Sequence, residues 1–322
     1  MHRRDDKPPP MKRARQDSSS QDMRETPNNG HAQGSQLTLP PLSLSILGVE
    51  PMDEFIKQIA DFIHHMIMTR PLTDVAPQAR VEVEAKIGLL RDKSSGQRLS
   101  LPILSEAILA PGVDVRFESN MSSNQHRHFN NLLNQLKTAS DQPNHPSTPL
   151  GYTHHYLVDS FFPPSDQGLS LGHPYDREKI RVTRDEKSGT VIESVRKIRL
   201  GDLNIVSPKN LADWRVSVNL EVPMPHPVGI ATHKRRKDRL SYTHEEFVID
   251  LTQVTTSAAN EPPQVLHELE IEIMRPELLL ASAAKRLDPN ASEHEKSAFD
   301  ELIRAFVNNA RILARNSSEG WQ

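Results

Sequence analysis

Glutamates recur at every second position in two short segments of the chain, Val81–Ile87 and Glu268–Ile273, with apolar residues between them. Alternate side chains of a β-strand share one face, so such carboxylates stand about 7 Å apart and repel one another. Two strands of this kind side by side are favourable only if a cation lies between them. Mg²⁺ and Mn²⁺ prefer oxygen ligands, so the pattern predicts a divalent metal site.

Basic residues alternate in the same way in Lys179–Thr183, Lys197–Leu200 and Arg235–Leu240. Another segment, Asp213–Glu221, has an apolar side, and Glu221 ends its polar side. If these charged faces point outward, they form ordinary polar strand surfaces with a basic patch. If they point inward with the glutamates, they line a lumen that must stay wet or hold a charged ligand. A polyphosphate with a divalent cation would satisfy both sets of charges.

These side chains need strands to position them, and eight segments alternate apolar and polar residues as strands do. The predicted strands are Val81–Leu89, Tyr156–Phe162, Lys179–Arg184, Val191–Ile205, Trp214–Val222, Arg235–Tyr242, Glu246–Val254 and Leu266–Met274. No helix-length segment separates most of them, which favours an antiparallel sheet or barrel over a parallel α/β sheet.

Three helices are predicted around this sheet from apolar residues at helical spacing. The first follows the capping residue Asp53, the second spans about Gln125–Lys137, and the third begins at the capping box Ser292-x-x-Glu295. If the charged strand faces line a lumen, the apolar faces must point outward. The helices would then cover the outside of the barrel.

The composition narrows the class of protein. The 322 residues include no cysteine, which excludes disulfides, thiolate zinc sites and cysteine nucleophiles. No apolar run reaches the roughly 18 residues that span a bilayer, and the charged, proline-rich start does not resemble a signal peptide, so no membrane association is expected. A P-loop motif is also absent. The net charge of −3 confines any anion site to a local basic cluster.

Residues 1–45 are rich in polar residues and proline, which predicts a disordered N-terminal tail. Its cluster Lys12–Arg15 is either a nuclear-import signal or a solvated run of charge. A catalytic domain is expected over residues 46–316 and a short C-terminal tail over 317–322.

Five motifs, in this order, resemble the fungal-type mRNA-capping enzyme β subunit, an RNA 5′-triphosphatase of the triphosphate tunnel metalloenzymes. They are Val81–Gly88, Asp213–Glu221, Arg235–Tyr242, Asp250-Leu-Thr252 and Glu268–Glu272. The resemblance implies an α+β fold that is mainly antiparallel β, an eight-stranded β-barrel tunnel with a charged lumen and helices packed outside. It also implies that the γ-phosphate of 5′-triphosphate RNA is hydrolysed to leave a diphosphate end, the first step of mRNA capping.

The resemblance further implies roles for single residues. Glu82, Glu84 and Glu272 would bind Mg²⁺ or Mn²⁺, Glu270 and Glu268 would act near the metal, and Glu221 would orient the attacking water. Arg181, Lys197, Arg235, Lys237 and Arg239 would hold the triphosphate, and Asp159, Asp250 and Thr252 would support the tunnel wall. One departure is Val248, which stands where relatives carry an arginine two residues before Asp250.

The implied partners are the 5′-triphosphate end of nascent mRNA and the RNA guanylyltransferase, with a homodimer left open. The implied location is the nucleus. The Trp-rich peptide by which some relatives hold the guanylyltransferase is absent, because the only tryptophans are Trp214 and Trp321. Two alternatives stay open. One is a tunnel hydrolase of NTP, inorganic polyphosphate or thiamine triphosphate, and the other is a non-catalytic polyphosphate- or RNA-binding module.

Overall fold

The computed structural model describes residues 41–71, 78–164, 178–258 and 261–317 of the chain. Two units are distinguished, Met1–Glu50 and Pro51–Gln322. Of the first unit only residues 41–50 are described, and they form bends and turns. Most of the predicted N-terminal tail, including Lys12–Arg15, lies outside the described residues, as do residues 318–322 of the C-terminal tail. The proposed domain boundaries therefore stay predictions.

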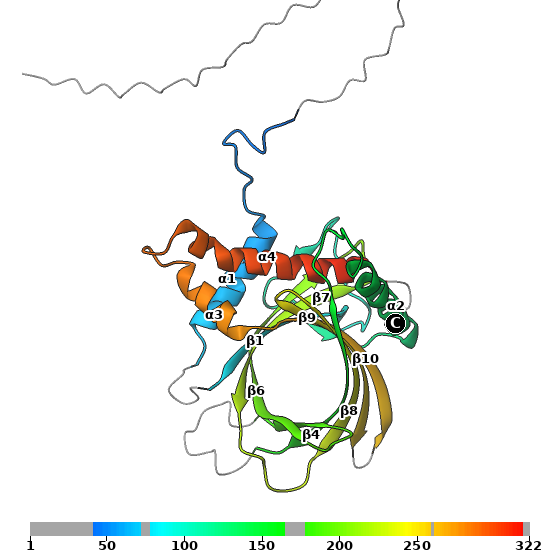
Figure 1. The fold of residues 1–322 in the computed structure, drawn as a ribbon. Helices are drawn as coiled ribbons and strands as arrows, with labels where there is room; N and C mark the ends of the chain where they lie inside the picture. The colour runs from blue at the N-terminus through cyan, green and yellow to red at the C-terminus, as the bar shows by residue number, and fades with distance from the viewer. Residues whose placement is uncertain (1–40, 72–77, 165–177, 259–260, 318–322) are drawn as a thin grey trace, which may run out of the picture. The chain divides into compact units, whose positions relative to one another are not determined.

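An antiparallel β-sheet of ten strands dominates the second unit, and eight of the strands close into a barrel (Figure 1). The strands are β1 (Arg80–Asp92), β2 (Ala107–Ile108), β3 (Val115–Glu118), β4 (Gly151–Phe162), β5 (Ile180–Asp185), β6 (Val191–Val206), β7 (Asp213–Pro223), β8 (His233–His244), β9 (Phe247–Ala258) and β10 (Glu261–Ile273). Around the barrel the order is β10-β9-β8-β4-β5-β6-β7-β1, and pairing of β1 with β10 closes the ring. The short strands β2 and β3 extend the sheet from β6 and β1. The predicted eight-stranded antiparallel barrel is thus confirmed.

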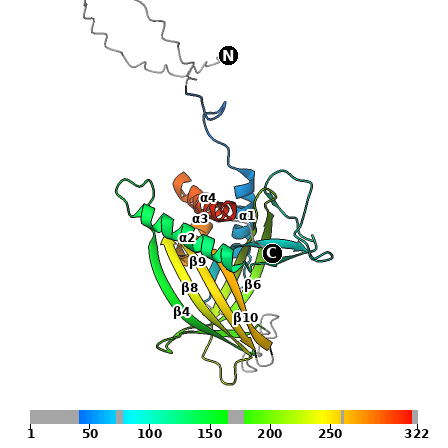
Figure 2. The same ribbon diagram turned by 90° about the vertical axis from the view of Figure 1, so that its right-hand side faces the viewer.

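Four helices gather along one side of the barrel, α1 (Glu54–Met68), α2 (Ser123–Ser140), α3 (Pro276–Lys285) and α4 (Glu293–Arg315) (Figure 1). In Figure 2, α2 lies across β9 and β10, which it contacts. The predicted N-terminal signals of the first and third helices are present, because Asp53 accepts from the Phe55 amide and Ser292 forms a capping box with Glu295. The prediction missed α3, although Pro276 occupies a first-turn position typical of helix starts. No helix in the described ranges is long and apolar enough to span a membrane.

The apolar faces of the barrel strands point outward, into a core shared with the helices. Val83 of β1, Val218 of β7 and Ile271 of β10 are all completely buried, in one cluster with Ile63 of α1 and Phe306 of α4. A small barrel usually fills its interior with such residues. Here they cover the outside, so the alternate, charged side chains of the same strands point into the lumen.

One contact between α2 and the barrel makes stability dependent on pH. His126 packs against His267 of β10, with ring centroids 4.7 Å apart. Burial, and then the neighbouring His267, lower the pKa of His126 from 6.5 to about 4. The unfolded chain therefore takes up this proton first, and stability is lost as the pH falls from about 6.5 towards 4.

Between pH 7 and pH 5, the free energy of unfolding should fall in the wild type. We expect this loss to be about 1–2 kcal/mol larger than the loss in a His126→Phe variant. Urea unfolding of both proteins at the two pH values measures this difference. Equal losses in the two proteins would contradict the assignment of this acid sensitivity to His126.

Candidate active site

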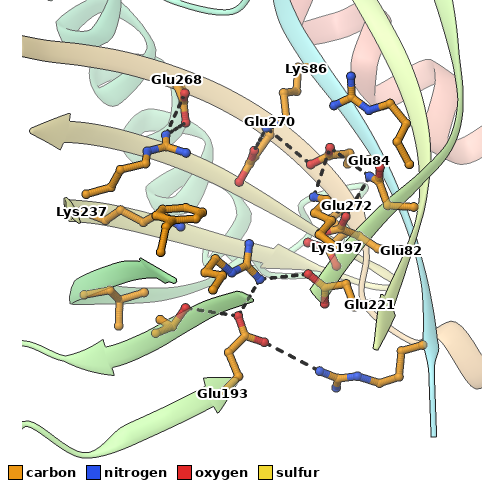
Figure 3. Close-up of a pocket in the computed structure, with 18 of the residues that line it drawn as sticks. Glu82, Glu84, Lys86, Glu193, Lys197, Glu221, Lys237, Glu268, Glu270 and Glu272 are labelled. Atoms are coloured by element: carbon orange, nitrogen blue, oxygen red, sulfur yellow. Dashed lines mark hydrogen bonds and ion pairs between the residues drawn. The ribbon is translucent and has the colours of Figure 1, made fainter. Parts of the chain in front are cut away.

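A cavity of about 880 Å³ occupies the barrel lumen, and most of the residues that line it are charged or polar (Figure 3). The lining includes the predicted site residues Glu82, Glu84, Arg181, Lys197, Glu221, Arg235, Lys237, Arg239, Glu268, Glu270 and Glu272. The remaining three predicted residues, Asp159, Asp250 and Thr252, are buried in the wall behind them. The inward direction expected for the charged faces is therefore what the structure shows.

Three of the glutamates form an acidic cluster where β1 meets β10. Glu84 and Glu272 are direct cross-strand partners, and Glu82 shares their face two residues along β1. Like charges directly opposite one another destabilise a sheet. The Lys197 ammonium contacts Glu82 and lies 3.4 Å from Glu84, but Glu272 has no hydrogen-bond or ion-pair partner among the residues that the structure describes.

The pKa values of this acidic cluster reflect its surplus of negative charge. Burial, followed by the charge of Glu84, raises the pKa of Glu82 to about 7. Burial and the charges of Glu82 and Glu270 raise the pKa of Glu272 well above its usual range. Burial opposes ionisation of Glu84 as well, but two neighbouring lysines outweigh it and lower that pKa.

Carboxylate oxygens with too little positive charge nearby suit a hard divalent cation. As the side chains stand, no three acidic or histidine side chains in the described part of the chain are arranged to hold an ion. Within the acidic cluster, the Lys197 ammonium contacts both Glu82 and Glu84. An ion bound there would replace this ammonium and supply the charge that Glu272 lacks.

Glu270 differs from Glu272 although both lie on the same face of β10. Lys86 approaches Glu270 to 2.9 Å and Arg239 approaches it to 3.1 Å, and these cations lower its pKa although partial burial opposes this. Arg239 also lies 2.7 Å from Asp250, which accepts a hydrogen bond from Ser241 as well. Asp250 therefore has two partners even though Val248 replaces the family arginine.

Most of the other basic side chains of the lumen pair with a carboxylate. Arg181 bridges Glu221 at 2.9 Å and Glu193 at 2.7 Å. Glu193 was not predicted as a site residue. It lies four residues before Lys197 on the same strand, so the alternation of the strand places both on the inward face and could have identified it.

Further along the lumen, Lys237 lies 2.5 Å from the buried Asp159, whose other carboxylate oxygen accepts from Thr183. Arg235 donates to both oxygens of Glu268 at 3.0 Å. Glu268 is four residues from Glu272 along β10, about 13 Å in an extended strand, so it lies apart from the acidic cluster (Figure 3).

Known proteins resemble this chain over most of its length. The family model described as the mRNA capping enzyme, beta chain, matches residues 49–319. The mRNA-capping enzyme subunit beta of Schizosaccharomyces pombe is 31% identical over 286 residues, 88% of this chain and 88% of that protein. Its counterpart from Cryptococcus neoformans is 34% identical over 86% of this chain and 65% of that longer protein.

Solved structures show the same fold. The structure of the S. pombe Pct1 RNA triphosphatase matches with a TM-score of 0.74 and 30% identity, and the match covers 87% of this chain and all of that one. Its complex with the Spt5 CTD matches with a TM-score of 0.75. The family resemblance inferred from the five sequence motifs is therefore confirmed.

Proposed function

The chain belongs to the family of the beta chain of the mRNA-capping enzyme, and we propose from this premise that its lumen removes the γ-phosphate from 5′-triphosphate RNA. The products are diphosphate-ended RNA and phosphate. The observation that carries this proposal is the acidic cluster facing the basic side chains within one cavity, with Glu272 opposite Glu84 and lacking a cation partner. A site of this kind gains most from a ligand that brings a divalent cation and several phosphate charges together.

We propose that Glu82, Glu84 and Glu272 hold Mg²⁺ or Mn²⁺. The donor set fits, because it offers carboxylate oxygens whose charge the neighbouring lysines do not balance. A divalent ion supplies Lewis-acid polarisation of phosphate oxygens when it is bound.

The basic side chains neutralise the charge of the triphosphate. Arg181, Lys197, Arg235, Lys237 and Arg239 all line the cavity and present N–H donors to phosphate oxygens. Asp159, Asp250 and Thr252 hold these donors in place from behind, since they contact Lys237 or Arg239. Such preorganised charge is the main contribution that a protein makes to phosphoryl transfer.

Glu221 orients the attacking water and accepts its proton. Arg181 fixes this carboxylate at 2.9 Å, so its second oxygen stays available to a water. Glu270, which pairs with Lys86 and Arg239, would act near the ion through a water, and Glu268 holds Arg235 further along the tunnel.

Comparison of kcat/KM between substrates distinguishes an RNA triphosphatase from a hydrolase of the other tunnel substrates. Phosphate release is measured from triphosphate-ended RNA, ATP, inorganic tripolyphosphate and thiamine triphosphate, each with Mg²⁺ and with Mn²⁺. We expect the highest kcat/KM with RNA. A higher kcat/KM for one of the small substrates would make this chain that type of hydrolase, and binding without release would make it a non-catalytic module.

We further propose that the protein works in the nucleus with the RNA guanylyltransferase of the capping enzyme. The name of its relatives as a subunit supports this partner. The sequence has no Trp-rich peptide, so we propose that another surface makes this contact.

Deletion of residues 1–45 should leave phosphate release unchanged and reduce nuclear accumulation. The reason is that the described residues that line the lumen all lie at or after Arg80, whereas the basic cluster Lys12–Arg15 lies in the deleted tail. Phosphate-release assays and fluorescence imaging of a tagged protein measure the two effects. A matched variant with Lys12, Arg13 and Arg15 changed to Ala tests the cluster alone, and slower phosphate release by the truncated protein would contradict the prediction.

A further inference from the structure

Two aromatic rings interrupt the charged wall of the lumen. Phe161 of β4 and His233 of β8 both line the cavity, and they are direct cross-strand partners. Their rings are stacked, with centroids 4.3 Å apart and planes inclined by 5°. Phe161 belongs to none of the hydrophobic clusters of the fold. Core packing therefore does not explain why this strand turns a phenyl ring inward.

The position of the ring pair follows from the pattern of β8. Arg239, Lys237, Arg235 and His233 occupy alternate positions of this strand and all line the cavity, one step of about 7 Å after another. His233 is the first residue of β8, so it marks the end of this row of cations. On its other side, Phe161 is the cross-strand partner of Arg181. The rings thus lie one inward-facing position beyond Arg235 along β8 and directly beside Arg181, next to the cations that would hold the phosphates.

The His233 ring is suited to stacking in its neutral form. Thr232 donates its hydroxyl proton to the Phe161 carbonyl oxygen at 3.1 Å, so its Oγ1 must accept from His233 Nδ1, also at 3.1 Å. Burial, then the charges of Lys179 and Arg235, lower the pKa of the imidazole. The ring is therefore uncharged and held in the Nδ1–H tautomer, parallel to the phenyl ring.

We propose that Phe161 and His233 form a stacking platform for the base of the RNA's 5′-terminal nucleotide, the one that carries the triphosphate. This inference rests on the proposed function and adds the nucleoside to the recognised substrate. Stacking on aromatic side chains tolerates any base, which suits an enzyme that acts on the ends of many transcripts. It also separates RNA from inorganic polyphosphates, which carry no base.

The test compares a substrate with a base and one without. In Phe161→Ala and His233→Ala, we expect the KM for triphosphate RNA to rise about tenfold or more, because removal of an aromatic stacking partner weakens binding by roughly that factor. The KM and kcat for inorganic tripolyphosphate should stay within about twofold of the wild type. Phe161→Trp restores a stacking surface and should keep the wild-type KM for RNA.

An aromatic pair on the opposite face of β4 gives the matched control. His154 and Tyr156 have ring centroids 4.4 Å apart and do not line the cavity, so alanine at either position should alter neither substrate's KM. Equal losses with RNA and tripolyphosphate, or no loss with RNA, would overturn the platform while leaving the triphosphatase intact. A wild type that releases no phosphate from RNA would overturn the proposed function, and the platform with it.

Discussion

Glu272→Gln should abolish phosphate release and, at the same time, make the metal-free protein more stable. Glu272 is the cross-strand partner of Glu84 and has no cation partner within the described part of the chain. Removal of a half-buried, unpaired charge relieves this repulsion, and we expect a gain of about 1 kcal/mol or an increase in Tm of ~2–4 °C. The loss of activity follows because an amide is a poor substitute for a metal-binding carboxylate.

Phosphate release with Mn²⁺ and thermal unfolding in EDTA at pH 8 measure the two effects. Glu82→Ala and Glu84→Ala should likewise abolish activity with the fold intact. Glu246→Ala is the control, because this glutamate pairs with Arg275 and does not line the lumen, and its activity should be that of the wild type. If one of the three cluster variants keeps more than a tenth of the wild-type rate, a loss of under ~1.4 kcal/mol, the substituted glutamate is not a metal ligand.

Glu221→Gln should lower kcat by about 10²–10³ and leave the KM for RNA and the affinity for Mn²⁺ nearly unchanged. The substitution keeps the size of the side chain but removes the charge that takes up a proton from water. Arg181 would still be fixed by Glu193 at 2.7 Å, so the phosphate-binding side of the lumen keeps its shape. Steady-state kinetics and a Mn²⁺ titration followed by electron paramagnetic resonance measure these quantities.

The same titration distinguishes two roles for Glu221. If the variant loses Mn²⁺ affinity as strongly as Glu84→Ala does, Glu221 is a metal ligand and the water-orienting role is wrong. If KM rises while kcat is retained, Glu221 acts on substrate binding through Arg181.

Alternation along the strands made the barrel and the direction of its faces predictable. Val83 and Glu84 are neighbours in sequence, and a strand must place them on opposite sides. Once helices with an apolar face flank the strands, the valine has a partner outside and the glutamate is left for the lumen. The short strands β2 and β3 escaped prediction because two and four residues are too few to show a period.

Alternation could not predict which glutamates of the lumen have a cation partner and which do not. Glu270 and Glu272 share a strand and a face, yet neighbouring cations balance the charge of Glu270 only. The difference depends on register, since Glu270 lies opposite Asp250 and its partner Arg239, whereas Glu272 lies opposite Val248. Strand register is set by contacts between distant segments, which periodicity within one segment does not contain.

Release of phosphate from RNA labelled either in its γ-phosphate or in its α-phosphate tests the central claim most directly. With Mg²⁺ or Mn²⁺, the γ label should appear as free phosphate and the α label should stay on the RNA. With EDTA in place of the metal, neither label should be released. Release of the γ label in EDTA, or release of the α label under any of these conditions, would contradict a metal-dependent removal of the terminal phosphate in this tunnel.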